Sequence, residues 1–330
     1  MELLEKKVLI ISSDIDRSTS EVLEWLIVKK QPFIRLNDNV CFDLDNIEIM
    51  QKQNKLVLKY NGEIIYLKNI KSFWYRRGSI SVRNNIPDSI PNAVKIYLNE
   101  ECKAIEAFII YELDKLAKIN HYGNSNLNKL YQLSLAVECG LNIPYTAIAN
   151  DSSTVKKILL EHKSIVSKSI QASLNYQTKS NMYSLMTSKF ENCDLDTSAA
   201  NFFYTKFQPQ IVKDFELRIF FLNKKFYTMA IFSQRNKKTE VDFRNYDFEN
   251  PNRCVPYKLP VFLEKKLLKL MNKLDLLSGS IDMIVRGKEY YFLEVNPVGQ
   301  FGMVSYPCNY YLEEKIAEIL SKNENKKLKN

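Results

Sequence analysis

The sequence predicts a mixed α/β protein with a βαβ unit near its start and antiparallel hairpins further along. The apolar run at 8–11 predicts a buried strand, and a helical segment separates it from a second apolar run at 33–36, which is typical of a parallel pair. Asn61-Gly62 divides two alternating segments and predicts a type I′ hairpin. At 330 residues the chain is long enough for two domains.

End signals place the expected helices. Ser18-x-x-Glu21 has the pattern of a capping box, so we expect a helix from Ser18 to about Lys29. Gly140 follows a helical segment and predicts its end. The remaining expected elements are a strand that ends in SFWYRR, one or two helices over 88–117, strands at 141–148 and 164–170, two strands within 215–234, a helix at 260–276 and a hairpin over 279–296.

The composition argues against several classes of protein. The net charge is +9, but the lysines are spread along the chain without a nucleic-acid-binding signature, so solvated surfaces explain most of it and no nucleic-acid partner is expected. The six cysteines form no CxxC pair, and the two histidines do not cluster with them, which predicts no zinc site, no disulfide scaffold and a cytoplasmic location. No apolar run reaches ~18 residues, so no membrane span is expected.

The segment YYFLEVNPVGQFG, at 290–302, raises the question of chemistry. Glu294 and Asn296 interrupt an apolar strand two residues apart, so both lie on one face of it. If the loop before this strand has three residues, 287–289, Asp282 on the preceding strand lies directly opposite Glu294. A two-residue loop would place the two acids on opposite faces of the hairpin.

Residues on opposed strand positions have Cβ atoms ~5 Å apart, so two carboxylates there repel each other unless one is protonated or a cation lies between them. The set of Asp282, Glu294 and Asn296 offers only oxygen ligands, which suits Mg²⁺. The alternative is that Asp282 caps a turn and that Glu294 pairs with a lysine.

A magnesium site of this kind predicts a polyphosphate ligand and therefore cations near it. Lys168 lies within the strand segment SIVSKSI, and Arg218 alternates with apolar residues in ELRIFFL. Each has a structural alternative: Lys168 could reach water from a sheet edge, and Arg218 could form a surface pair with Glu216.

The order of Lys129, Lys168, FQPQI, ELRIF, Asp282 and Glu294-x-Asn296 resembles the ATP-grasp fold. FWYRR, the segment from SNLNKLYQ to IPYTAI, DFR and LEVNPVGQF also resemble the ATP-grasp peptide maturases, which include the microviridin-type ligases and the grasp-with-spasm maturases. The resemblance covers nearly the whole chain. It implies an α/β (α+β) ATP-grasp fold with a pre-ATP-grasp βαβ domain at 1–120, a central lid subdomain at 121–205, a C-terminal subdomain with the metal site at 206–322, ATP sandwiched between the two subdomains, and a frayed tail at 323–330.

The resemblance also implies roles for individual residues. Lys129 and Lys168 would contact the ATP phosphates and the adenine side, Gln208, Gln210 and Ile211 would form the hinge that holds adenine, and Asp214 would contact the ribose. Arg218 would neutralise the γ-phosphate, and Arg244 in DFR would bind the substrate carboxylate unless it is a surface arginine. Arg76 and Arg77 would share that work or pair with an acid, and Asp282, Glu294 and Asn296 would hold Mg²⁺.

The activity that the resemblance implies is ATP-dependent macrocyclisation of a ribosomally made precursor peptide with a leader and an acidic core. Acyl-phosphates on Asp or Glu side chains would be attacked by Thr or Ser to give ω-esters, or by Lys to give ω-amides, and a homodimer is expected. Three alternatives stay open: an ATP-grasp ligase that adds an amino acid to a protein or small peptide, a non-catalytic nucleotide-binding module, and a nucleic-acid-binding protein. SIQASLNYQTKS contains no glycine, which leaves the identity of the phosphate lid open.

Overall fold

The structure is a computed structural model that describes residues 6–51, 54–84, 86–87, 89–162, 164–171, 175–178, 181–184, 187–190, 200–234 and 249–322. The chain divides into two compact units. Unit 1 contains Met1–Ser125, Gln300–Ser305 and Tyr311–Asn330, and unit 2 contains Asn126–Gly299 and Tyr306–Tyr310. Within the described ranges, no helix has both the length and the apolar character needed to cross a membrane.

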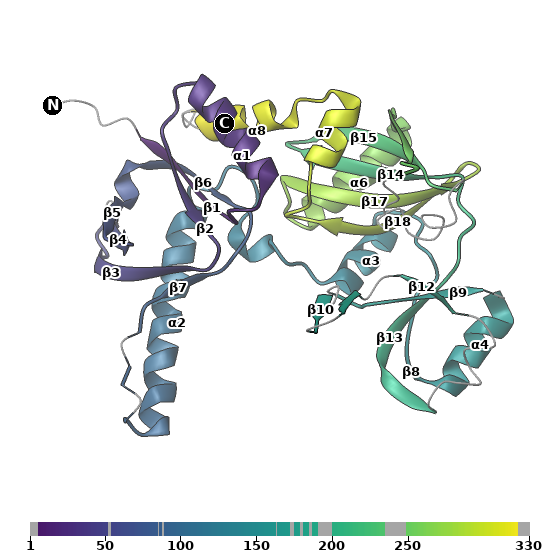
Figure 1. Ribbon diagram of the computed structural model, residues 1–330, viewed down its shortest axis with the longest axis horizontal. Coiled ribbons are helices and arrows are strands. Elements are labelled where there is room, and N and C mark those ends of the chain that lie inside the picture. Colours follow the sequence, from purple (N-terminus) through teal and green to yellow (C-terminus); the bar gives the residue numbers. More distant parts are fainter. Residues whose placement is uncertain are drawn as a thin grey trace. The chain divides into compact units, whose positions relative to one another are not determined.

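Unit 1 is built on a parallel three-stranded sheet in the order β2-β1-β6 and a second sheet in the order β5-β4-β3-β7 (Figure 1). The predicted βαβ start is confirmed, because β1 pairs with β2 in parallel through the crossover helix α1. The elements are β1 (Lys7–Ser12), α1 (Arg17–Val28), β2 (Phe33–Asn37), β3 (Val40–Glu48), β4 (Lys55–Tyr60), β5 (Glu63–Tyr66), η1 (Leu67–Asn69), β6 (Ile70–Tyr75), β7 (Ile80–Val82), α2 (Asn92–Asp114), η2 (Tyr122–Asn124) and α8 (Leu312–Ser321), and α7 (Gly302–Cys308) crosses from one unit to the other.

Two local sequence signals in unit 1, one for a hairpin turn and one for a helix start, had different outcomes. The hairpin of β4 and β5 is confirmed: Asn61 and Gly62 have φ angles of 49° and 87°, as a type I′ turn requires. The capping box is wrong, because α1 begins at Arg17, and the Ser18 hydroxyl donates to Gln300 Oε1 at 2.8 Å instead of capping the helix. The Ser18 side chain therefore bonds to a residue that is distant in the sequence and not to the backbone of its own helix.

Unit 2 contains a four-stranded sheet in the order β12-β9-β13-β8 and a five-stranded antiparallel sheet in the order β16-β15-β14-β17-β18. Helix α4 was not expected from the sequence; the Asp151 carboxylate accepts hydrogen bonds from Thr154 N and Oγ1, both at 2.8 Å, in its first turn. The elements are α3 (Lys129–Glu138), β8 (Ala147–Asp151), α4 (Ser152–His162), β9 (Ile165–Lys168), β10 (Asn175–Gln177), β11 (Met182–Ser184), β12 (Ser188–Phe190), β13 (Asn201–Pro209), β14 (Phe215–Leu222), β15 (Lys225–Phe232), β16 (Arg253–Pro256), α6 (Val261–Lys273), β17 (Ser278–Arg286) and β18 (Glu289–Asn296).

Candidate functional site

The five-stranded sheet of unit 2 has one apolar face and one face that carries charged and polar side chains among apolar ones, which we call the polar face. Alternate residues such as Ile219, Ile281 and Val295 belong to a buried cluster with residues of α3 and α6. The residues between them point the other way, because side chains alternate along a strand. That second face carries Glu216, Arg218, Ser280, Asp282, Glu294 and Asn296. The candidate site lies on this polar face.

A β-bulge in β18 determines which residues reach the polar face. The turn between β17 and β18 has two residues, since Arg286 pairs with Glu289, so the expected three-residue loop is wrong. Met283 pairs with Phe292, but the next pair is Asp282 with Glu294, because Leu293 is an extra residue in the ladder. The predicted pairing of the two acids is therefore confirmed, although for a different reason.

The two acids are held by two cations that were predicted to bind phosphate. Arg218, Asp282 and Glu294 lie side by side on three neighbouring strands. Arg218 Nη1 is 2.6 Å from Asp282 Oδ1, and the two side chains are only 10% and 11% exposed. Lys129 Nζ is 2.8 Å from Glu294 Oε2. Glu294 thus pairs with a lysine, which was the structural alternative to a role in metal binding. That lysine, Lys129, is itself a candidate phosphate ligand.

The alternative pair of Arg218 with Glu216 does not form. Glu216 instead accepts hydrogen bonds from Lys213 Nζ at 2.6 Å and from Ser233 Oγ at 2.9 Å, in a buried cluster on the same face of the sheet. Arg218 pairs with Asp282, and its Nε atom is buried and has no hydrogen-bond partner among the residues that the structure describes. An arginine with an unused donor beside a carboxylate is suited to bind a second anion.

Asn296 completes the predicted oxygen set. It lies one step along the face from Glu294 and pairs across the ladder with Ser280, whose side chain is fully buried. Its Oδ1 atom accepts a hydrogen bond from Val298 N at 3.1 Å, which fixes the side chain where the strand ends. The donors of Asp282, Glu294 and Asn296 are all oxygens on adjacent positions, so the residues present fit a Mg²⁺ ion.

Gln132 was missed by the sequence analysis. Gln132 is 1% exposed, and its Oε1 atom accepts a hydrogen bond from Val295 N at 2.9 Å. Val295 lies between the predicted metal ligands Glu294 and Asn296 in the sequence. Gln132 lies three residues after Lys129, so α3 presents both side chains from one face. That spacing was the only signal in the sequence, because the partner of Gln132 is a backbone N–H group 163 residues away.

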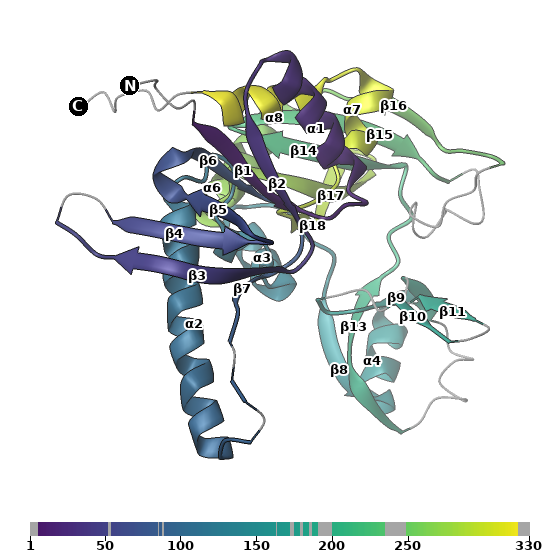
Figure 2. The same cartoon turned by 60° about the vertical axis from the view of Figure 1, so that its left-hand side comes forward.

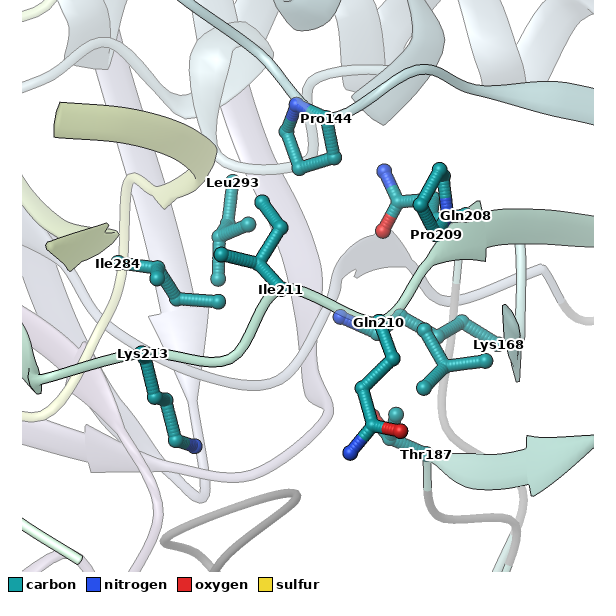
Figure 3. A pocket seen from close by; sticks show the side chains of 11 residues that line it. Pro144, Lys168, Thr187, Gln208, Pro209, Gln210, Ile211, Lys213, Ile284 and Leu293 are labelled. Atoms are coloured by element: carbon teal, nitrogen blue, oxygen red, sulfur yellow. The ribbon is translucent and has the colours of Figure 1, made fainter. Parts of the chain in front are cut away.

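A pocket in unit 2 is lined by residues that are close to the two acids in the sequence: Ile284 follows Asp282 by two residues, and Leu293 precedes Glu294 (Figure 3). Apolar side chains from Ile211, Ile284 and Leu293 gather on one side of it, and Lys168, Gln210 and Thr187 lie on the other. The remaining lining residues are Pro144, Val166, Gln208, Pro209 and Lys213. The pocket therefore brings together the predicted hinge residues Gln208, Gln210 and Ile211 with Lys168.

Gln208 and Gln210, which were predicted to form the hinge, are fixed by hydrogen bonds to neighbouring side chains. Gln208 Nε2 donates to Thr146 Oγ1 at 2.9 Å, and Gln210 Oε1 accepts from Ser164 Oγ at 2.9 Å. Lys206 is a second residue that the sequence analysis missed. It lies directly opposite Lys168 on the neighbouring strand and is 7% exposed, so two cationic side chains share the face that borders the pocket.

The other predicted residues lie in different surroundings. Asp214 Oδ2 accepts a hydrogen bond from Gly287 N at 2.6 Å and so holds the β17–β18 turn. Arg76, in unit 1, is 3% exposed, lies 3.5 Å from the Asp16 carboxylate, and has its pKa lowered to about 10 by burial. Arg77 is half-buried beside it. Arg244 lies outside the described residues.

Comparisons with known proteins agree with these features. Residues 7–126 match the family described as the MvdD pre-ATP grasp domain. The macrocyclase MdnC of Microcystis aeruginosa MRC, solved with the precursor peptide MdnA, has a TM-score of 0.72 and 28% identity over 95% of this chain and 99% of its own. MdnB of the same organism has a TM-score of 0.68 and 22% identity over 96% and 99%.

A third similar structure is a RiPP-associated ATP-grasp ligase of Chryseobacterium gregarium, in complex with ADP and a leader and core peptide. It has a TM-score of 0.75 and 23% identity over 96% of this chain and 95% of its own. No curated protein sequence matches the chain. The fold and the family resemblance expected from the sequence are confirmed: the chain has the ATP-grasp fold of the RiPP peptide ligases, with an MvdD-type pre-ATP-grasp domain over residues 7–126.

Proposed function

We propose that the protein is an ATP-dependent ligase that cross-links a ribosomally made precursor peptide. Asp or Glu side chains of the peptide would be phosphorylated to acyl-phosphates, and Thr or Ser hydroxyls or Lys amines of the same peptide would displace the phosphate. The products would be ω-esters or ω-amides together with ADP and phosphate. The observations that carry the proposal are the row of Arg218, Asp282 and Glu294 and, in the same unit, the pocket of Figure 3, to which Ile284 and Leu293 contribute from the same two strands as the acids.

Asp282, Glu294 and Asn296 would hold Mg²⁺, because they offer oxygen donors from adjacent positions of β17 and β18. The ion would supply positive charge to the β- and γ-phosphates of bound ATP. The remaining work falls to residues of the chain itself. The apolar wall formed by Ile211, Ile284 and Leu293 offers a slot for a planar ring, and Lys168 marks its polar side.

Lys129 and Arg218 would turn from carboxylates to phosphates when the nucleotide binds. Each now neutralises one acid, at 2.8 Å and 2.6 Å respectively. Binding of the metal-bound nucleotide would give both acids and both cations a new partner, so no charge is left alone in a site that is largely shielded from water. Arg218, held beside Asp282 at one end of the row, would neutralise the charge that develops on the transferred phosphoryl group.

The substrate side is proposed from the family resemblance and from charge. The net charge of +9 suits a precursor peptide with an acidic core. Arg244, Arg76 and Arg77 are the candidate residues for the acyl carboxylate, and burial of Arg76 against Asp16 makes it the weakest of the three. We further propose a cytoplasmic homodimer that acts on the peptide without nucleic acid or membrane.

Intact-mass spectrometry tests the proposal. The protein is incubated with MgATP and an acidic, Thr- or Lys-rich peptide encoded beside its gene, and ADP release is measured in the same samples. Loss of one water per bond formed is the expected result. The matched control is Asp282→Asn, which keeps the size of the side chain and removes the negative charge of a proposed metal ligand.

Three results would argue against the proposal. Gain of an amino-acid mass in the presence of free amino acids would indicate the amino-acid ligase instead. Nucleotide binding without ADP release or change in peptide mass would indicate a non-catalytic module. Equal turnover by wild type and Asp282→Asn would reject the assigned site.

A further inference from the structure

The side chain of Gln171 ties the segment that follows β9 to the start of helix α3. Its Oε1 atom accepts a hydrogen bond from Lys129 N at 2.9 Å. Its Nε2 atom donates to Asn126 Oδ1 at 2.9 Å and to Leu127 O at 3.0 Å. A glutamine amide has one carbonyl oxygen and one NH₂ group, and here both are used on the single short segment 126–129.

The bond from Lys129 N satisfies the first N–H group of α3. The N–H groups in the first turn of a helix have no partner within the helix itself. Asn128 Oδ1 accepts from Leu130 N at 2.9 Å and from Tyr131 N at 3.1 Å. The N–H group of Lys129, where the helix begins, is bonded to Gln171 instead. A side chain 42 residues away in the sequence therefore helps to fix the position at which α3 starts.

Two routes of contact lead from the start of α3 to the strand that carries the predicted metal ligands. Lys129 Nζ lies 2.8 Å from Glu294 Oε2. Leu127 O, which is also an acceptor for the Gln171 amide, accepts from Gln132 Nε2 at 3.3 Å. The Oε1 atom of that second glutamine accepts from the backbone N–H group that follows Glu294. A displacement of the first turn of α3 would therefore move partners of β18 at the metal ligands.

Gln171 is also close in sequence to the other lysine that was predicted to contact ATP. Strand β9 ends at Lys168, whose side chain lines the pocket of Figure 3, and Gln171 follows three residues later. The Gln171 amide thus connects the strand segment that carries Lys168 with the helix that carries Lys129. These two lysines are 39 residues apart in the sequence and belong to different elements.

We propose that Gln171 is a positioning residue of the nucleotide site, which holds Lys129 in place relative to Lys168 so that both can contact the phosphates of ATP. It would act through Lys129 and not by contact with the nucleotide. The inference rests on the proposed function, because that function assigns Lys129 to the phosphates. The alternative is a contribution to stability alone, since the loss of a bond at the start of a helix weakens a fold wherever the helix lies.

Binding of MgATP and of adenosine, which lacks the phosphates, separates the two roles when it is measured by titration calorimetry of the full chain. Gln171→Ala should raise the dissociation constant of MgATP about tenfold, the lower end of what loss of an orienting partner costs. It should leave that of adenosine unchanged. Asn126→Ala, which removes only one of the three hydrogen bonds, should give a smaller change in the same direction.

A double variant tests whether Gln171 acts through Lys129. Lys129→Met should weaken MgATP binding by itself, because it removes the cation. Lys129→Met/Gln171→Ala should then bind MgATP no more weakly than Lys129→Met alone, since the side chain that Gln171 positions is already absent. Hydrogen–deuterium exchange of the segment 126–131 should be faster in Gln171→Ala than in wild type, which reports the loosened helix start directly.

The matched control is Asp151→Ala, which removes hydrogen bonds from the first turn of another helix of unit 2, α4. Figure 2 shows α4 along β8 and β13, and its buried residues pack with Ile165 and Phe207. Side chains alternate along a strand, so α4 covers the face of that sheet opposite to Lys168. Asp151→Ala and Gln171→Ala should both lower the unfolding temperature, but only Gln171→Ala should weaken MgATP binding.

Four results would overturn the inference. An affinity for MgATP equal to that of wild type, with faster exchange over 126–131, would leave Gln171 a role in stability alone. Equal losses of MgATP and adenosine binding would mean that the whole pocket has changed. A further loss in the Lys129→Met background would mean that Gln171 does not act through that lysine. A wild-type chain that binds no MgATP would reject the proposed function as well, whereas the first three results reject only the role of Gln171. If Gln171→Ala does not fold, Asn126→Ala decides by the same criteria.

Discussion

Replacement of Arg218 by glutamine would test whether Arg218 stabilises the fold by neutralising the buried carboxylate of Asp282. In the structure Arg218 Nη1 lies 2.6 Å from Asp282 Oδ1, and both side chains are about nine-tenths buried. Arg218→Gln leaves the Asp282 carboxylate buried without its cation. Breaking such a pair costs ~3–5 kcal/mol, and we take about 3 kcal/mol because each side chain keeps some contact with water.

The expected effect is large enough to measure by calorimetry. For a unit of ~150–250 residues, 1 kcal/mol changes the unfolding temperature by ~2–4 °C, so Arg218→Gln should lower it by roughly 6–12 °C. Asp282→Asn should also destabilise, because it strands the arginine. The double variant Arg218→Gln/Asp282→Asn should lose less than the sum of the two, since replacing both partners leaves no charge alone.

The decisive measurement is the change in the unfolding temperature of each variant when Mg²⁺ is added. Mg²⁺ should stabilise Arg218→Gln more than wild type, because in the variant Asp282 has no internal cation to give up. Asp282→Asn should gain little from Mg²⁺. Single variants that unfold within 1 °C of wild type, with equal shifts on adding Mg²⁺ to all proteins, would refute the assignment of these residues to a metal and phosphate site.

Three smaller predictions concern the support of the site and of the fold. Gln132→Met should leave Val295 N buried without an acceptor, at a cost of ~1–3 kcal/mol, and should raise the Mg²⁺ concentration needed for half-maximal nucleotide binding, measured by titration calorimetry. Hydrogen bonds from the first turn of α4 lower the pKa of Asp151 to about 2 from its ordinary 3.8. The ionised Asp151 carboxylate therefore stabilises the fold, and this contribution is complete above pH 3.8 and disappears as the pH falls through about 2. The difference in free energy of unfolding between wild type and Asp151→Asn, measured with denaturant, should shrink across that pH window. Gly78→Ala should destabilise unit 1 by several kcal/mol in the same assay, because φ is 84° there and a Cβ atom would collide with the Asp38 carbonyl.

The chemistry of the site could be predicted from the sequence because it depends on alternation. Glu294 and Asn296 share a face at any register of the hairpin, since they are two residues apart on one strand. Asp282 was harder to place, because its face relative to Glu294 depends on a loop length that the sequence left open. The loop prediction failed while the pairing held, since the bulge at Leu293 compensates for the shorter turn.

The partners of the charged groups could not be predicted, because they come from distant segments. The sequence offered Glu216 as a neighbour for Arg218, but the structure selects Asp282, 64 residues away, and gives Glu216 to Lys213. Asp214 likewise finds the backbone of Gly287. Local spacing in the sequence identified the charged residues of the candidate site. The order of the strands in the sheet determined which of those residues form ion pairs.

The bulge at Leu293 also determines which insertions and deletions the hairpin can tolerate. Between Asp282 and Glu294 the chain contains one residue more than a regular ladder closed by a two-residue turn can accommodate. A deletion of Leu293 would make the ladder regular and leave Asp282 opposite Glu294, while removing one of the three residues that form the apolar wall of the pocket. A deletion between Glu294 and Asn296 would instead turn Asn296 away from the acids. Length changes on the turn side of Glu294 therefore alter the ring slot, and those beyond it alter the oxygen ligand set.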